Sequence, residues 1–229
     1  MSDRRRRQAW YRSRLTALLL AVALLGGCQA GTVAGSQRPA PTGGRHQPAP
    51  IRFAGRTSTT TRPFLLAGGL IVASAEHRGS GGFKVEVLNK DGHPQRVLFL
   101  ATGRYRGSTG FGLRGGIYRL AISGATPWRV QIDQPRGLTA AALPQQYRGS
   151  GDALVGPFQA GGRLVVDVEH HGPGDISIEL LSDNGASLYF LLEDSGPLRT
   201  SRAAEDLQTG GYYLRVEATR AWKLRLHGG

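Results

Sequence analysis

From residue 52 onward, apolar residues recur at every second position rather than at the spacing of a helix. Phe83, Val85 and Val87 alternate with charged residues, and the same period returns at 176–180 and 222–226. A period of two places one set of side chains on the buried face of a strand and the other set in water. Gly-rich breaks separate these runs. The pattern predicts antiparallel strands joined by short turns, packed sheet on sheet.

The strand pattern occurs twice. Residues 67–92 and 160–185 agree at 11 of 26 positions without a gap. Five further apolar or glycine positions recur 94 residues later, namely Leu113, Gly116, Tyr118, Leu120 and Trp128. We therefore expect an all-β fold with two tandem antiparallel β-sandwich, jelly-roll-like domains, residues 52–133 and 145–229, joined by a linker at 134–144.

The N-terminus has the layout of a signal peptide. Six arginines lie between residues 4 and 14, and the uncharged segment Leu15–Gly27 follows them. As a helix this segment would rise only about 20 Å, whereas the hydrocarbon core of a bilayer is about 30 Å thick. We predict that residues 1–27 are a signal peptide rather than a permanent transmembrane span.

The apolar segment ends in Leu25-Gly26-Gly27-Cys28, which resembles the lipobox of bacterial lipoproteins. The resemblance implies a diacylglyceryl thioether and an N-acyl chain on Cys28, and Gln29 after it implies transfer to the outer membrane. Cys28 is the only cysteine, so its acylation leaves no thiol for a disulfide, a metal or nucleophilic chemistry. We expect no other cofactor.

Residues 28–51 are rich in Gly, Pro, Ala and Gln and almost free of large apolar side chains. Such a segment cannot bury enough surface to offset the entropy of ordering it. We expect a disordered tether with an average span of roughly 25 to 30 Å, which would hold the folded part away from the membrane.

One pattern near the end of each repeat points to a family. Gly116-x-Tyr118-x-Leu120-x-Ile122 is followed by a Trp128-led alternation, and both recur at 210–216 and 222–224. This resembles the end of bacterial prepeptidase C-terminal-type domains, which are small jelly-roll sandwiches of secreted proteins. The matching motifs are mostly core and turn positions, so the resemblance indicates fold rather than activity. Since members of this family are usually non-catalytic appendages, it also implies that role.

Three local patterns could be sites but also have structural explanations. Glu169–Asp175 carries two adjacent histidines, yet neighbouring strand residues point to opposite faces, so we predict a hairpin and no metal site. Asn89–Gly92 and Ser182–Gly185 contain fragments of a calcium loop but are favoured hairpin turns. Trp128 and Trp222 could stack on sugars, but they share a face with apolar neighbours, which predicts core positions.

No motif indicates catalysis, since the chain lacks a G-x-S-x-G elbow, an H-E-x-x-H pair and a P-loop. We therefore expect no enzymatic activity and no catalytic residues. A triad assembled from distant positions would not be visible in one sequence.

Charge separates the two repeats. Residues 52–133 hold twelve Lys or Arg against four acids, a net +8, whereas residues 145–229 hold eight against eleven, a net −3. Arginine pairs with phosphates and carboxylates, so the first repeat predicts an anion-binding surface. Its candidate residues are Arg104, Arg106, Arg114, Arg119 and Arg129. The alternatives are a solvated basic face or docking on the acidic repeat.

Together these features predict an outer-membrane lipoprotein with a non-catalytic binding or structural role in the cell envelope. The expected partners are the membrane, through the lipid anchor, and an anionic lipid, lipopolysaccharide or polysaccharide. The alternative is an accessory, protein-binding subunit of a secreted enzyme or of an envelope assembly complex. An exported lipoprotein rarely meets nucleic acid, so we do not expect that partner.

Overall fold

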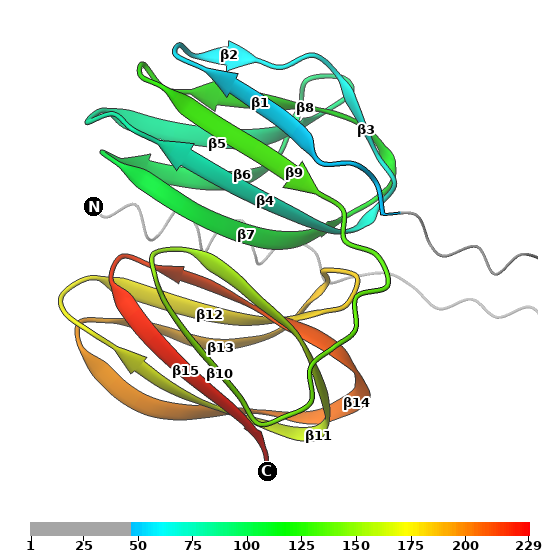
Figure 1. The fold of residues 1–229 in the computed structure, drawn as a ribbon, viewed down its shortest axis with the longest axis vertical. Coiled ribbons are helices and arrows are strands. Elements are labelled where there is room, and N and C mark those ends of the chain that lie inside the picture. The colour runs from blue at the N-terminus through cyan, green and yellow to red at the C-terminus, as the bar shows by residue number, and fades with distance from the viewer. Residues whose placement is uncertain (1–46) are drawn as a thin grey trace, which may run out of the picture. The chain divides into compact units, whose positions relative to one another are not determined.

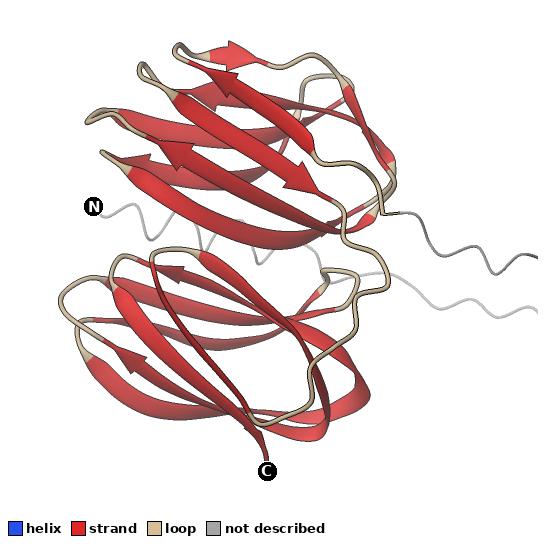
Figure 2. Ribbon diagram, in the orientation of Figure 1, coloured by secondary structure: helices blue, strands red, loops and turns tan. Residues whose placement is uncertain are grey.

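The computed structural model describes residues 47–229, and every regular element in them is a strand (Figure 2). This confirms the all-β, antiparallel fold class that the alternation predicts. Among these residues there is no helix of the length and apolarity needed to cross a bilayer.

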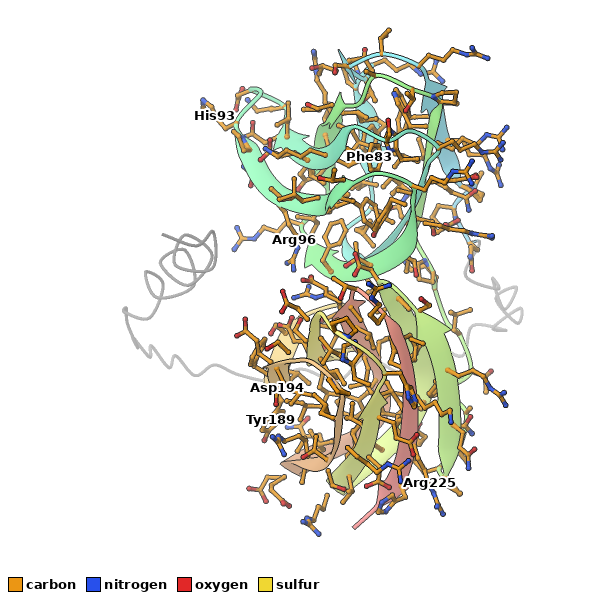
Figure 3. All side chains as sticks on the ribbon, turned by 90° about the vertical axis from the view of Figure 1, so that its left-hand side faces the viewer. Phe83, His93, Arg96, Tyr189, Asp194 and Arg225 are labelled. Atoms are coloured by element: carbon orange, nitrogen blue, oxygen red, sulfur yellow. The ribbon has the colours of Figure 1, made fainter. Side chains whose placement is uncertain are left out.

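The first half of the described chain forms two antiparallel sheets. Its strands are β1 (Ile51–Gly55), β2 (Thr59–Thr60), β3 (Phe64–Leu66), β4 (Gly69–His77), β5 (Gly82–Asn89), β6 (Pro94–Thr102), β7 (Tyr105–Leu113), β8 (Gly116–Ser123) and β9 (Trp128–Asp133) (Figure 1). One sheet has the order β1-β9-β4-β7, and the other has the order β2-β8-β5-β6 with β3 beside β8. Phe83, Val85 and Val87 are buried in a core between the sheets, as their alternation predicts (Phe83 is labelled in Figure 3).

The second half reaches the same arrangement with fewer, longer strands. These are β10 (Gln145–Ser150), β11 (Ala153–His170), β12 (Asp175–Ser182), β13 (Ser187–Ser195), β14 (Leu198–Ala218) and β15 (Ala221–Gly228), in the order β10-β15-β11-β14-β12-β13. The pairing of β11 with β14 shifts register near Gly162. Strand β15 pairs with β11 only from Leu164 onward, and β12 pairs with β14 only from Tyr212 onward. A separate core includes the alternating Ile176, Ile178 and Leu180.

The repeat seen in the sequence is also a repeat of strand pairing. Glu76 on β4 lies opposite Arg106 on β7 and Arg129 on β9. Glu169 on β11 lies opposite Arg199 on β14 and Lys223 on β15 in the same way. Both halves belong to one compact unit, Gly43–Gly229, and their division into two independent domains stays a prediction.

Both tryptophans are core residues, as the sequence predicts. Trp128 and Trp222 are 3% and 2% exposed, and their indole Nε1 atoms donate to the carbonyls of Thr57 and Gly151. A Cβ atom on Gly55 would lie 2.9 Å from Cε2 of Trp128, so this neighbouring strand can pass the ring only as glycine. Neither indole is available as a sugar-stacking platform.

Two of the predicted turns are hairpins and one is not. The turns Asn89–Gly92 and Ser182–Gly185 join paired strands, β5 to β6 and β12 to β13, with both final glycines at positive φ. The hairpin prediction for Glu169–Asp175 is wrong, because β11 and β12 both pair with β14 and not with each other. The glycines there close a tight connection between strands that are not neighbours.

The predictions for Cys28, the signal peptide and most of the tether lie outside the described residues. Strand β1 begins at Ile51, within the range expected to be tether. In the expected linker, the buried Gln134 accepts a hydrogen bond from the backbone of Ala67, and Ala141 bridges to Phe158. The linker therefore packs on both halves.

Candidate functional site: an arginine face

A groove of about 780 Å³ lies on the outer face of the four-stranded sheet. Its lining comes from β1, β9, β4 and β7, with Ser150 and Asp152 of the second half at one end. A recess of about 340 Å³ shares Ala54, Glu76 and Arg129 with the groove, so the two hollows adjoin. We call the basic residues that line them the arginine face, namely Arg52, Arg56, Arg78, Arg106 and Arg129.

Glu76 lies at the centre of the arginine face. Its Oε1 accepts a hydrogen bond of 2.8 Å from Nε of Arg78. This hydrogen bond, with the charges of Arg78, Arg129 and Arg106, outweighs partial desolvation and lowers the pKa of the carboxyl below 4.5. Arg106 and Arg129 flank Glu76 in register, but within residues 47–229 neither makes an ion pair within 4.0 Å. No hydrogen bond holds either guanidinium group within the described residues, so their donors are accessible to solvent.

Arg52 is fixed in place by a short chain of side chains. Its Nε donates to Oε1 of Gln131 at 2.9 Å, and Nε2 of Gln131 donates to both carboxylate oxygens of Asp133. The hydrogen bond occupies Nε, and the exposed guanidinium has two further nitrogens that can donate. Such pre-orientation lowers the entropy lost when a ligand binds.

The end of the groove is built by contacts between the halves. The hydroxyl of Tyr105 donates to Oδ2 of Asp152 at 2.7 Å, and the amide of Ser108 donates to the Asp152 carbonyl at 3.0 Å. Burial, together with the charge and hydrogen bond of Asp152, raises the pKa of Tyr105, so the phenol stays protonated and keeps donating. Oδ1 of Asp152 accepts from the amide of Ala218, which fixes the carboxylate from both halves.

Below this end, the second half packs tightly against β7. Leu70 of β4 forms an apolar cluster with Leu181 and Tyr213. A Cβ atom on Gly110 of β7 would lie 2.6 Å from a methyl carbon of Leu154, so the glycine permits the close approach. This packing holds the wall of the groove in place.

On the equivalent face of the second half, the two carboxylates lie close to basic side chains. Glu169 lies 3.2 Å from Arg199, 3.6 Å from Lys223 and 3.6 Å from His171. Asp167 lies 3.5 Å from His227 on the same face. The strand register is therefore shared by the two halves. Among residues 47–229, the residues opposite Glu169, Arg199 and Lys223, lie within 4.0 Å of it, whereas Arg148 and Arg225 on the same face make no ion pair within that distance.

The structure brings together two of the five arginines predicted to bind anions. Arg106 and Arg129 lie in the arginine face, whereas Arg119 lies on β8 in the other sheet. Arg104 and Arg114 are exposed in the connections that precede and follow β7. The predicted set is therefore split over several surfaces, because the alternation gives the exposed side of each strand and not the order of strands in the sheets.

Three members of the arginine face were missed in the sequence, namely Arg52, Arg56 and Arg78. Arg52 alternates with Ile51 and Phe53, so its exposure could have been inferred from the strand period. Its position beside Gln131 could not, because β1 and β9 are separated by most of the first half.

The adjacent histidines of Glu169–Asp175 do not converge. His170 is buried, and its Nδ1 lies 2.8 Å from the Gly196 carbonyl, while the side chain of His171 is 51% exposed. His77 occupies the equivalent position and makes the equivalent contact, 2.8 Å to the Gly103 carbonyl. Across residues 47–229, no three His, Cys, Asp or Glu side chains gather as a metal site would require. The motif helps to pack the core.

Hydroxyl and amide groups lie between the arginines of the groove. Ser74 and Ser108 share a row with Arg52 and Gln131, and Ala54 leaves the sheet surface low beside them. The aromatic residues among the lining are Phe53, whose ring packs against Phe64, and the buried Trp128. This arrangement can bind a negatively charged, hydroxyl-rich ligand by charge-assisted and neutral hydrogen bonds.

No protein family profile matches the chain, and no curated protein matches it. Among solved structures, it is similar to the conserved protein of unknown function PA5104 from Pseudomonas aeruginosa PAO1, with 16% identity over 78% of each chain and a TM-score of 0.23. It is also similar to the PBSX exported protein XepA, with 9% identity, 77% and 86% coverage and a TM-score of 0.24. A GH2 beta-galacturonidase from Eisenbergiella tayi matches at 18% identity over 73% of this chain and 34% of its own, with a TM-score of 0.24. These TM-scores are too low to bear on fold or function.

Proposed function

We propose that the protein is an outer-membrane lipoprotein, anchored through Cys28, whose β-sandwich part binds an anionic component of the cell envelope through the arginine face. In this proposal the protein binds and does not catalyse. The anionic ligand is a polysaccharide, lipopolysaccharide or lipid headgroup.

The proposal that the protein binds an anion rests on one observation. Arg106 and Arg129 flank a single carboxylate, and that carboxylate is already hydrogen-bonded to Arg78. The equivalent Arg199 and Lys223 are paired with Glu169. Arg106 and Arg129 also line a groove, where their guanidinium groups can contact a ligand.

The anchor rests on the sequence, through the apolar segment before Leu25-Gly26-Gly27-Cys28. We expect Cys28→Ser to abolish incorporation of labelled palmitate and to move the protein from the membrane to the soluble fraction. Adding Ser36→Cys to the Cys28→Ser protein tests whether any nearby thiol in the tether is sufficient for acylation. Retention of both label and membrane association by the Cys28→Ser protein would overturn the anchor.

Anion binding by the arginine face is tested with dextran sulfate, a generic polyanion, and the full chain in a non-ionic detergent. Replacing Arg106 and Arg129 by Gln should weaken binding roughly tenfold or more, because each charge-assisted contact contributes about 1.5 to 3 kcal/mol. The matched control replaces Arg199 and Lys223 by Gln, with an expected change below about twofold, since surface ion pairs contribute little. Equal losses from the two pairs, or no binding by the wild type, would refute the arginine face.

A second candidate, a protein-binding accessory subunit, is favoured by the outer face of the five-stranded sheet. Leu65 on β3 is 69% exposed and lies opposite Ile117 on β8, which is 50% exposed. Paired exposed aliphatic side chains are suited to a protein partner. Such a partner should remain bound at 1 M salt, where the Debye length falls to about 3 Å, and should be lost in a Leu65→Ser, Ile117→Ser variant.

A further inference from the structure

We propose that the arginine face binds an extended acidic polysaccharide, whose carboxylated sugar chain runs along the strands from Arg52 toward Arg56, rather than a single compact phosphate. This inference rests on the proposed function and specifies its ligand class. It follows from the spacing of the arginines, from the hydroxyl groups between them and from the chemistry of the groove floor.

The first step is the spacing of the arginines. Arg52 lies one row of the sheet beyond Arg106 and Arg129, because Gln131 and Ser108 are its row neighbours. Arg56 and Arg78 follow the ends of β1 and β4 at the other side of that row. Rows on one face of a strand are roughly 7 Å apart, so Arg52 and Arg56, four residues apart, are separated by roughly 13 Å. One compact anion cannot contact both, whereas a chain with repeated charges can.

The second step is the continuity of the path. The larger groove and the smaller recess share Ala54, Glu76 and Arg129, so the hollow continues from one row to the next. Arg129 and Arg106 stand on its two sides, on β9 and β7. A ligand that lies along β4 would therefore pass between them and reach the row on either side.

The third step is the chemistry of the floor. Ser74 and Ser108 present hydroxyl groups, and Ala54 and Gly107 present almost no side chain. Hydroxyls between guanidinium groups match a sugar ring that carries both hydroxyls and a carboxylate. Acyl chains would need an apolar lining, and bases would need exposed aromatic platforms. The two aromatic residues of the lining, Phe53 and Trp128, are directed into the core instead.

Acidic side chains limit where the polysaccharide can lie. Asp152 forms the wall beside Ser108, and its carboxylate is held by Tyr105 and the amide of Ala218. Repulsion from this wall would keep a polyanion over β1, β9 and β4 and away from the contact between the halves. Glu76 beneath it remains neutralised by Arg78.

The test is calorimetric titration of the full chain, in a non-ionic detergent, with galacturonate and its linear dimer, tetramer and hexamer. Affinity should rise roughly tenfold or more from the single ring to the tetramer, as each added carboxylate reaches another row. The fully methyl-esterified tetramer has the same rings without charge and should not bind measurably.

Variants separate a long site from a short one. Arg56→Gln should weaken the hexamer several-fold and should weaken the single ring less than the Arg106→Gln, Arg129→Gln change does, because Arg56 lies at the far end of the path. Arg106→Gln with Arg129→Gln should weaken every length, and the control pair Arg199→Gln with Lys223→Gln should weaken none by more than about twofold. All of these positions are exposed or outside the two cores, and thermal melting checks that each variant is folded.

Inorganic phosphate and phosphatidylglycerol vesicles distinguish failure of this inference from failure of the proposed function. Arginine-dependent binding of phosphate or vesicles, with no gain from the single ring to the hexamer, would overturn the extended polysaccharide and leave an anion-binding face. Absence of binding to every anion would overturn both. Length-dependent binding that is lost in Arg106→Gln with Arg129→Gln would support both.

Discussion

The two halves carry similar rows of charges on equivalent strands, but the charges are paired differently. In the second half, Glu169 is shared by Arg199 and Lys223 at 3.2 and 3.6 Å. In the first half, the corresponding Arg106 and Arg129 have no such partner among the described residues, because Glu76 is hydrogen-bonded to Arg78. The residue in the place of Arg78 is His171, which lies 3.6 Å from Glu169. The two halves thus differ at the position after the buried histidine, and we propose that this difference leaves Arg106 and Arg129 able to bind a ligand.

The halves differ also in the sheet face opposite the arginine face. In the second half this face is covered, and Glu179 and Arg215 form a buried ion pair there, 7% and 6% exposed. Arg215 also donates to the Gly110 carbonyl of the first half at 3.3 Å. The corresponding Glu86 pairs with Lys84 at 3.0 Å, but the two side chains are 18% and 40% exposed. The residue opposite Glu86 is Ala121, where the second half has Arg215, so the buried ion pair has no counterpart in the first half.

The largest effect should come from breaking the buried pair. Glu179→Ala removes the carboxylate packed against a buried guanidinium, and we expect a loss of about 3 to 5 kcal/mol in the free energy of unfolding, measured by urea denaturation. Glu86→Ala is the matched control, with an expected loss of less than about 1 kcal/mol because its pair is partly solvated. Similar losses from the two variants would show that the cover over Glu179 is not formed in solution.

A smaller effect is expected at the buried histidines. Nε2 of His77 lies 2.7 Å from the hydroxyl of Thr126, whereas Nε2 of His170 is buried without a hydrogen-bond partner in the structure. Thr126→Val would leave His77 in the condition of His170, and we expect a loss of about 1 to 3 kcal/mol in stability. Thr126→Ser keeps the hydroxyl and should retain most of it. An unchanged melting curve for Thr126→Val would mean that this hydrogen bond contributes nothing.

Exchanging the residue that separates the two rows should change binding more than stability. Arg78→His should release Glu76 to pair with Arg106 and Arg129 and should weaken dextran sulfate binding several-fold, worth about 1 kcal/mol. His171→Arg is the reciprocal change and should free Arg199 and Lys223, giving the second half a measurable affinity. If Arg78→His binds as tightly as the wild type, Glu76 is not what the arginines compete for.

The smallest expected effect is on proton binding by Glu76. Its pKa lies below the ordinary 4.5, first because of the hydrogen bond from Arg78. A lowered pKa in the folded state contributes stability above pH 4.5, and that contribution is lost as the pH falls through the folded-state pKa. We expect Arg78→Gln to raise the Glu76 pKa toward 4.5 in a carbon-13 NMR titration. A pKa that does not move would place its cause elsewhere.

Much of the fold could be predicted because strand alternation and turn chemistry are local. The alternation at Phe83, Val85 and Val87 identified core positions, and Asn89–Gly92 identified a hairpin, since both depend on neighbouring residues. The connection at Glu169–Asp175 could not be distinguished from a hairpin, because the glycines needed for a tight turn are the same whether or not the strands pair.

The site was predictable only in part, for the same reason. Strand period showed that Arg129 faces water, but the row that joins it to Glu76 and Arg106 spans three strands far apart in sequence. The pairing state of a charge depends on distances between side chains of different strands. The dipeptides Glu76-His77 and Glu169-His170 are identical. Their sequence therefore did not reveal whether the basic residues opposite each glutamate are ion-paired.

The most direct test of the central claim is NMR of the arginine side-chain Nε–Hε groups during titration with dextran sulfate. The account predicts that the signals of Arg106 and Arg129 shift and saturate with the ligand, while the signal of Arg199, held 3.2 Å from Glu169, does not. Equal shifts of Arg106 and Arg199, or shifts confined to the second half, would contradict it.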